Sequence, residues 1–294
     1  MRKILVFITA ILIFAACGNK AEEEARIAEQ KKDSTALHIA LLPTFECLPL
    51  IVAEEEGMFD SCGINVALDM YYSQADCDTA MAERSAEAMI TDIIRGKYWE
   101  RENKENLYYA TWTNTHYMLI SSKKARVKEL EQMTDRLMAT TRYSISDQLA
   151  DSAMERAGKT PEEMFKVPIN NQEIRLNMLI ENKMDAAFLQ HPYAAEALAH
   201  GGTLLMHGGK SNAGVLAFHE TADREMVKKM LAVYDEACDM INQKGVMHFA
   251  PAVEKYMHKD ITKWTKHMKD IKFRHSSPVD DSFEREARQW LKEN

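Results

Sequence analysis

The sequence predicts an α/β fold built on largely parallel sheets. Short apolar runs bounded by polar residues, glycine or proline indicate strands, and longer stretches of helical period lie between them. Strand and helix alternate along most of the chain, which is typical of βαβ units. With 294 residues and 46% hydrophobic content, the chain has enough apolar material for one large or two modest domains.

The first strands and helices follow from apolar runs and turn residues. The run over 37–43 is apolar and ends at proline, which predicts a buried strand. The stretch 48–58 suits a helix with Gly57 near its C-terminal end. We then expect strands over 64–71, 86–90, 107–111 and 117–121, and helices over 76–83 and 93–102.

A second α/β region begins near Val127. Strands are expected over 136–141, 165–169 and 184–189, and helices over 147–157, 173–182 and 193–199. Either Ser144 or Ser146 caps the first of these helices, and Gly158 ends it. A last strand over 213–219 precedes amphipathic stretches over 224–244, 250–256 and 282–292.

The N-terminus has the pattern of an export signal. Two basic residues precede an apolar run over 4–16, which is too short to span a bilayer comfortably. The following Ala15-Ala16-Cys17 resembles the lipobox of bacterial lipoproteins, in which the cysteine is acylated. This resemblance implies a signal peptide over 1–16, a lipid-anchored tether over 17–36, and export to the periplasmic or cell-surface side of a membrane. An ordinary secretory signal or an uncleaved anchor is the alternative.

Charge and cysteine content exclude several classes of function. The net charge is −8, and removal of the two positive residues of the signal gives −10 for the mature chain, which argues against nucleic acid as a partner. No CxxC pair is present, so neither a zinc ribbon nor a thioredoxin-type site is indicated. We expect one disulfide or none. If one forms, we favour Cys47 with Cys77, because both follow adjacent strands at one sheet edge.

Signatures of catalysis and metal binding are missing from the sequence. It contains no G-x-S-x-G, no HExxH and no P-loop, and its ten histidines are scattered. We therefore expect no enzyme activity, no cofactor and no metal site.

Three motifs, in order along the chain, resemble those of periplasmic solute-binding proteins. The first is LPLIVAEEEGMF over 48–59, followed by GINVAL over 63–68. The second is SAEAMITD over 85–92, and the third is DAAFLQHPYA over 185–194. Together they resemble the substrate-binding component of ABC importers, in the branch that handles nitrate, alkylsulfonates, taurine and thiamin-pyrimidine precursors.

The resemblance implies a type 2 periplasmic-binding-protein fold, with two lobes on a two-strand hinge that close on a ligand. Lobe 1 would comprise 37–122 and 213–294, and lobe 2 would comprise 127–207. It also implies a small-molecule ligand, an ABC permease and ATPase as partners, and a monomer. The alternatives are an enzyme of pyrimidine or menaquinone precursor metabolism on the same fold, or a ligand sensor.

Candidate ligand-binding residues are those that follow the predicted strands, since ligands of open α/β sheets bind beyond the carboxyl ends of strands. Glu46 suits a cationic or amino group, or is a solvated carboxylate. Phe45 either stacks on a ligand or packs beneath its loop, and Thr91 either binds a ligand or caps a helix. Without clustered arginines, we expect a heteroaromatic or amine-bearing metabolite. The full set is Thr44, Phe45, Glu46, Tyr72, Thr91, Asp92, Asn114, His116, Thr141, Tyr143, Asn171, Gln190, His191 and Tyr193.

Overall fold

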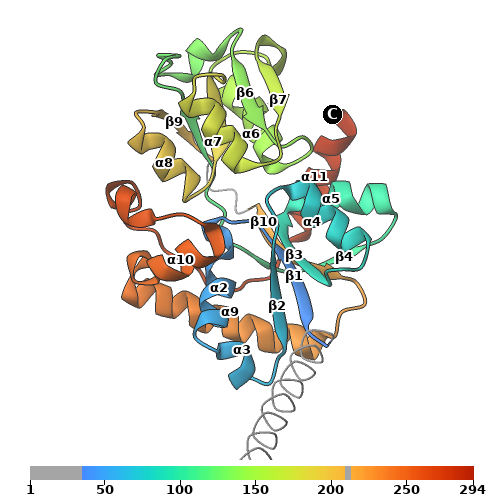
Figure 1. Ribbon diagram of the computed structural model, residues 1–294. Coiled ribbons are helices and arrows are strands. Elements are labelled where there is room, and N and C mark those ends of the chain that lie inside the picture. The colour runs from blue at the N-terminus through green and yellow to red at the C-terminus, as the bar shows by residue number, and fades with distance from the viewer. Residues whose placement is uncertain (1–34, 209–212) are drawn as a thin grey trace, which may run out of the picture.

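The computed structural model describes residues 35–208 and 213–294. The predicted signal peptide, Cys17 and the tether as far as residue 34 lie outside the described residues. The described chain forms two lobes, each with a five-stranded sheet flanked by helices (Figure 1). This confirms the predicted two-lobe α/β architecture.

The sheet of the first lobe has the strand order β2-β1-β3-β10-β4. Its strands are β1 (Leu37–Leu41), β2 (Val66–Met70), β3 (Ala88–Asp92), β4 (Leu107–Trp112) and β10 (Gly214–His219). β1 pairs in parallel with β2 and β3, whereas β10 is antiparallel to β3 and β4. The two central strands β3 and β10 are buried along their whole length, because helices cover both faces of the sheet.

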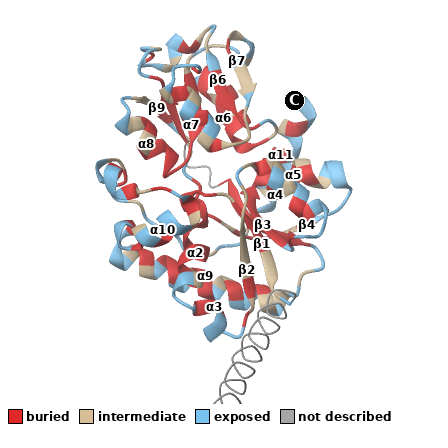
Figure 2. Ribbon diagram, viewed as in Figure 1, coloured by how far each residue is buried: buried red, intermediate tan, exposed pale blue. Residues whose placement is uncertain are grey.

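Successive side chains of a strand point to opposite faces of the sheet, so the core of this lobe is divided between the two faces. Ile39 and Leu41 pack with α2 (Leu48–Glu55), α3 (Met58–Ser61), α9 (Arg224–Lys244) and α10 (Ala250–Met257). Ala40 points to the other face, which is covered by α4 (Gln74–Ala82), α5 (Ile93–Asn103) and α11 (Asp281–Glu293). Figure 2 shows the burial of the strands on which these helices pack.

The single helix predicted over 48–58 is wrong, because the structure has two helices there. α2 ends at Glu55, and Gly57 has a φ of 65°, a left-handed conformation that glycine adopts without strain. α3 begins directly after this glycine.

The sheet of the second lobe has the order β7-β6-β8-β5-β9. Its strands are β5 (Met118–Ser121), β6 (Leu137–Thr140), β7 (Phe165–Pro168), β8 (Ala186–Leu189) and β9 (Thr203–His207), and its helices are α6 (Ile145–Arg156), α7 (Gln172–Ile180) and α8 (Tyr193–Ala199). β6 is parallel to β7 and β8, and β5 is antiparallel to β8 and β9. Each sheet therefore contains one strand that runs against the other four.

Two features of this lobe differ from the sequence-based prediction. β9 was not predicted, because it is an edge strand in which only Met206 is buried and the apolar signal is weak. β5 pairs in the second sheet, so the lobe boundary lies before Met118 and not after residue 122. Of the two serines offered as caps for α6, Ser144 has this role.

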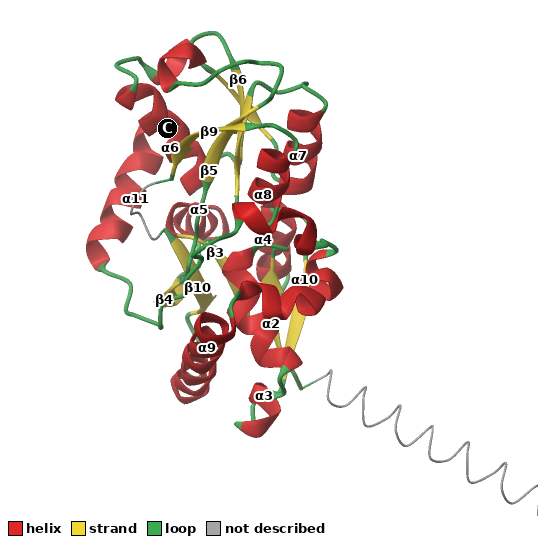
Figure 3. Cartoon of the chain, turned by 90° about the vertical axis from the view of Figure 1, so that its left-hand side faces the viewer, coloured by secondary structure: helices red, strands yellow, loops and turns green. Residues whose placement is uncertain are grey.

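Two segments connect the lobes, one between β4 and β5 and the other between β9 and β10. The C-terminal region adds contacts between them. Lys259, which precedes the 3₁₀ helix η5 (Ile261–His267), has its Nζ 2.6 Å from Glu173 of α7 and 2.9 Å from Glu196 of α8. On another side of the molecule, α11 packs on α5 and extends toward α6 (Figure 3).

The cysteines within the described residues are free thiols. The disulfide favoured for Cys47 and Cys77 is therefore not formed. Both side chains are fully buried, and burial raises the pKa of each thiol. Within 35–208 and 213–294, none of the helices is long and apolar enough to cross a membrane.

Candidate functional site

A small cavity lies where the two lobes meet. Its walls come from the loops after β1 and β2, from the end of β3, from the β4–β5 connection and from the residue after β8. These are mostly carboxyl ends of strands, where ligands of open α/β sheets bind. The space is at most that of a single water molecule, which indicates that the lobes are closed around it. The lining residues are Leu42, Thr44, Glu46, Cys47, Gln74, Ile90, Thr91, Asp92, Thr115, Tyr117 and Gln190.

Glu46 joins the first lobe, the connection between the lobes and the second lobe. It lies in the 3₁₀ helix η1 (Phe45–Cys47) and is buried. Its Oε1 accepts hydrogen bonds from the hydroxyls of Thr113 and Thr115, and its Oε2 accepts one from Gln190 Nε2 at 2.9 Å. Burial raises the pKa of Glu46, while the three donors favour the ionised form and oppose that shift.

A second glutamine fixes the orientation of the Gln190 amide. Gln172 Nε2 donates to Gln190 Oε1 at 2.6 Å, and the Gln190 backbone N–H donates to Gln172 Oε1 at 2.7 Å. Because the amide oxygen of Gln190 is already occupied, its Nε2 faces Glu46. The contact between the lobes is therefore built from side chains whose orientation is set.

Asp92 is the second buried carboxylate of the cavity. Its Oδ1 accepts from the backbone N–H of Arg95 at 2.9 Å and from that of Ile145, in the second lobe, at 3.0 Å. No described residue donates to its Oδ2 in the structure. Burial raises the pKa of Asp92 to about 7, and the neighbouring charge of Glu46 acts in the same direction.

Thr91 does not cap the helix that follows β3, because Asp92 has that role. The Thr91 hydroxyl is buried and lacks a hydrogen-bond partner within the described part of the chain. A buried polar group of this kind costs free energy unless something else satisfies it. Since Thr91 lines the cavity, a bound molecule is one means of satisfying it.

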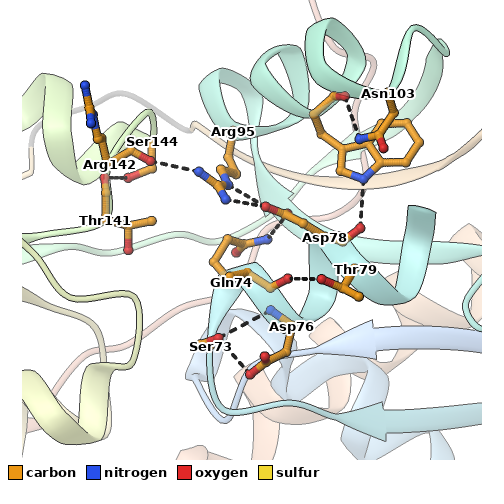
Figure 4. Close-up of polar contacts among 12 residues, drawn as sticks. Ser73, Gln74, Asp76, Asp78, Thr79, Arg95, Asn103, Thr141, Arg142 and Ser144 are labelled. Carbon is orange, nitrogen blue, oxygen red and sulfur yellow. Dashed lines mark hydrogen bonds and ion pairs between the residues drawn. The ribbon is translucent and has the colours of Figure 1, made fainter. Parts of the chain in front are cut away.

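The arginine nearest in sequence to Asp92 is bound elsewhere. The Arg95 side chain forms an ion pair with Asp78, with a 2.5 Å separation between Nη2 and Oδ2. Its Nη1 donates to the carbonyl of Arg142 in the second lobe at 2.9 Å (Figure 4). Arg95 therefore links the lobes, and its guanidinium pairs with Asp78 rather than with a carboxylate of the cavity.

The structure brings part of the predicted site together. Thr44, Glu46, Thr91, Asp92 and Gln190 all line the cavity. Gln74, Thr115 and Tyr117 join them without having been selected. The first two could have been found from the rule of strand ends, since they follow β2 and β4. Tyr117 was not selected because the sequence analysis placed it inside the strand predicted over 117–121.

Phe45 and His191 lie beside the cavity and pack against each other across the lobes. Their ring centroids are 5.7 Å apart, and the Phe45 N–H donates to the His191 carbonyl at 2.9 Å. Phe45 is buried in the core of the first lobe, so its packing role is the one observed. Burial lowers the pKa of His191 to about 4.

The remaining candidates have other positions. Tyr72 is 57% exposed, and Asn171 caps α7 through Ile174 N–H at 3.0 Å. The others line different depressions, bind the C-terminal segment or face a buried cation. His116 and Tyr143 line separate depressions, Asn114 bonds the backbone of Arg274, Thr141 accepts from Arg175, and Tyr193 faces Lys259 at 5.1 Å.

Arg175 is a buried charge that the sequence analysis did not select. Its Nε donates to the Ile169 carbonyl at 2.6 Å, its Nη1 to the Phe188 carbonyl at 2.9 Å, and its Nη2 to the Thr141 hydroxyl. Burial lowers its pKa to about 10. Its donors are used to hold the strand ends of the second lobe, which is a structural role.

The chemistry of the cavity is that of recognition by hydrogen bonds and charge. It offers carboxylates, hydroxyls and amides, and the described residues that line it include no lysine, arginine or histidine. Within the described ranges, no cluster of three or more histidine, cysteine or acidic residues is placed to hold a metal ion.

Comparison with known proteins gives a consistent result. The model of the family described as NMT1/THI5 like matches residues 44–254. The alkanesulfonate-binding protein SsuA from Xanthomonas axonopodis pv. citri, solved with MOPS, has a similar structure, with a TM-score of 0.75, 12% identity, and coverage of 87% of this chain and 91% of that one.

Two further solved structures are similar. The ligand-binding component of an ABC-type import system from Staphylococcus aureus has a TM-score of 0.74 at 14% identity, covering 88% of this chain and 91% of that chain. The nitrate-binding protein NrtA from Synechocystis PCC 6803 has a TM-score of 0.70 at 10% identity, covering 82% and 73%. No protein of curated function matches the sequence. The fold is thus the two-lobe fold of periplasmic binding proteins.

Proposed function

Because this chain belongs to the NMT1/THI5-like family, we propose that it is a solute-binding protein that delivers a small molecule to an ABC importer. The observation that supports this most is the cavity between the lobes, which is lined by polar groups at strand ends. Three of the similar structures are described as binding proteins or import components. A permease and an ATPase would be the partners, and the protein would act as a monomer.

Capture and release would follow from opening and closing of the lobes. The hydrogen bonds from Gln190 to Glu46, from Ile145 to Asp92 and from Arg95 to Arg142 all cross between the lobes. Opening would break them and expose the buried carboxylates to water. A ligand that restores contacts inside the cavity would favour the closed state by its differential affinity.

Ligand binding is tested by thermal unfolding of the chain from residue 18 onward. A ligand at 100 times its Kd adds about 2.7 kcal/mol to stability, which is a readable shift in Tm. We expect such a shift with at least one member of a library of amines, nucleobases, thiamin precursors, sulfonates and oxyanions. Turnover of a library member without a stabilising shift would favour an enzyme instead.

We further propose that Cys17 is acylated and anchors the exported protein to a membrane. In a bacterial host that matures lipoproteins, the chain is expected to sediment with membranes and to incorporate an alkyne-tagged fatty acid. Cys17→Ser should abolish labelling and move the protein to the soluble fraction or leave it with its signal uncut. Cys62→Ser, which removes an exposed thiol within the fold, is the matched control. Equal labelling of all three forms would contradict the anchor.

A further inference from the structure

The negative charge of the cavity is not balanced by its own walls. Glu46 and Asp92 both line it, and the charge of Glu46 raises the cost of ionising Asp92. No described residue of the lining carries a positive charge. Two ionised carboxylates in so buried a place are costly unless a cation accompanies them.

The nearby buried arginines form no ion pair with either carboxylate of the cavity, although the charge of Arg95 partly offsets the effect of burial on Asp92. The guanidinium of Arg95 is bound by Asp78 and by a carbonyl of the second lobe. The guanidinium of Arg175 is used by two carbonyls and by the Thr141 hydroxyl. Neither donates a side-chain hydrogen bond to Glu46 or Asp92 in the structure.

Acceptor groups without donors also face the cavity. No described residue donates to Asp92 Oδ2, and the Thr91 hydroxyl is buried without a partner in the described part of the chain. An ammonium group has three donors and no acceptor, and an amidinium likewise only donates. Oxygen acceptors next to fixed negative charge are what such a group requires.

We propose that the ligand of this chain carries a cationic nitrogen group, which binds at Asp92 Oδ2 and the Thr91 hydroxyl within the field of Glu46. This inference rests on the proposed function as a solute-binding protein. The cationic group takes the small space of the closed cavity, and the rest of a larger ligand extends toward the adjoining depression at His116 and His207, which shares Thr115 and Tyr117 with the cavity. An anionic group would instead meet two carboxylates at close range.

The test separates small molecules by charge and uses the full chain in mild detergent at pH 7.5. A soluble metabolite extract is divided into fractions retained by a cation exchanger, retained by an anion exchanger, and retained by neither. Each fraction is added to the protein, and Tm is followed by intrinsic tryptophan fluorescence. Molecules released from the protein on denaturation are then identified by mass spectrometry.

The expected result is a stabilising shift with the cation-exchange fraction. Asp92→Asn should weaken the affinity for the released molecule at least tenfold, and Thr91→Val should weaken it to a smaller extent. Glu56→Gln removes the same charge from an exposed position and serves as the control, with affinity unchanged. A shift only with the anionic or unretained fraction would overturn the inference and leave the binding function intact. No shift with any fraction would count against both.

Discussion

Asp92→Asn is expected to stabilise the unliganded protein at pH 8 while weakening its ligand affinity at least tenfold. The folded-state pKa of Asp92 is raised to about 7 from 3.8, so the folded state holds a proton between these values that the unfolded state has lost. Stability from this group is therefore present below pH 4 and is lost as pH rises through 7. The difference corresponds to about 4 kcal/mol.

Asparagine avoids this loss because it does not ionise. Its Oδ1 still accepts from the N–H groups of Arg95 and Ile145, which Asp92 binds in the structure. The lost interaction of a negative cap with the helix dipole is smaller, about 2 kcal/mol at most. The charges of Glu46 and Arg95 are present in both proteins, and the pKa of about 7 for Asp92 already includes their effect on its carboxylate.

The measurement is denaturant unfolding of both proteins from pH 4 to pH 8.5. The difference in free energy of unfolding should nearly vanish near pH 4, grow in favour of the variant up to about pH 7, and level off above that. A difference that does not change with pH would show that Asp92 has an ordinary pKa. In that case ionisation of the buried Asp92 carboxylate would not lower the stability of the unliganded protein, and there would be no trade-off between stability and binding at this residue.

Gly214→Ala is expected to lower both stability and ligand binding. A Cβ at this position would overlap Glu46 Oε1 and the hydroxyls of Thr113 and Thr115. Its backbone does not have a positive φ, so the effect would come from contact and not from backbone strain. Overpacking and the broken hydrogen bonds of Glu46 together should cost on the order of 3 kcal/mol, which corresponds to several degrees in Tm.

The matched control is Gly57→Ala. Gly57 has a φ of 65° with open space around it, so a methyl group there tests backbone conformation alone, at a cost of about 1 kcal/mol. Thermal unfolding and ligand titration of both variants separate the two effects. If Gly214→Ala melted like the control and bound ligand normally, the tight packing around Glu46 would not matter for the site.

The sequence could predict those cavity residues that directly follow a buried apolar strand. Glu46, Thr91, Asp92 and Gln190 were selected because they follow buried apolar strands, and the cavity contains all four. The same rule also selected Tyr72 and Asn171, which the structure places at an exposed position and at a helix cap. The position after a strand identifies the edge of a sheet, but it does not determine which way a side chain points.

The sequence by itself determined the α/β class, because apolar periodicity is a local property that burial in parallel sheets enforces, and the resemblance of its motifs to those of solute-binding proteins implied the two lobes. Only the tertiary structure decided that β5 belongs to the second sheet, since strand pairing joins residues distant in sequence. The same holds for the charge balance of the cavity. The guanidinium of Arg95 pairs with Asp78 rather than with Asp92, and that of Arg175 is bound by carbonyls, so neither carboxylate of the cavity has an ion-pair partner among these arginines. Such partnerships depend on distance and burial, which no run of residues encodes locally.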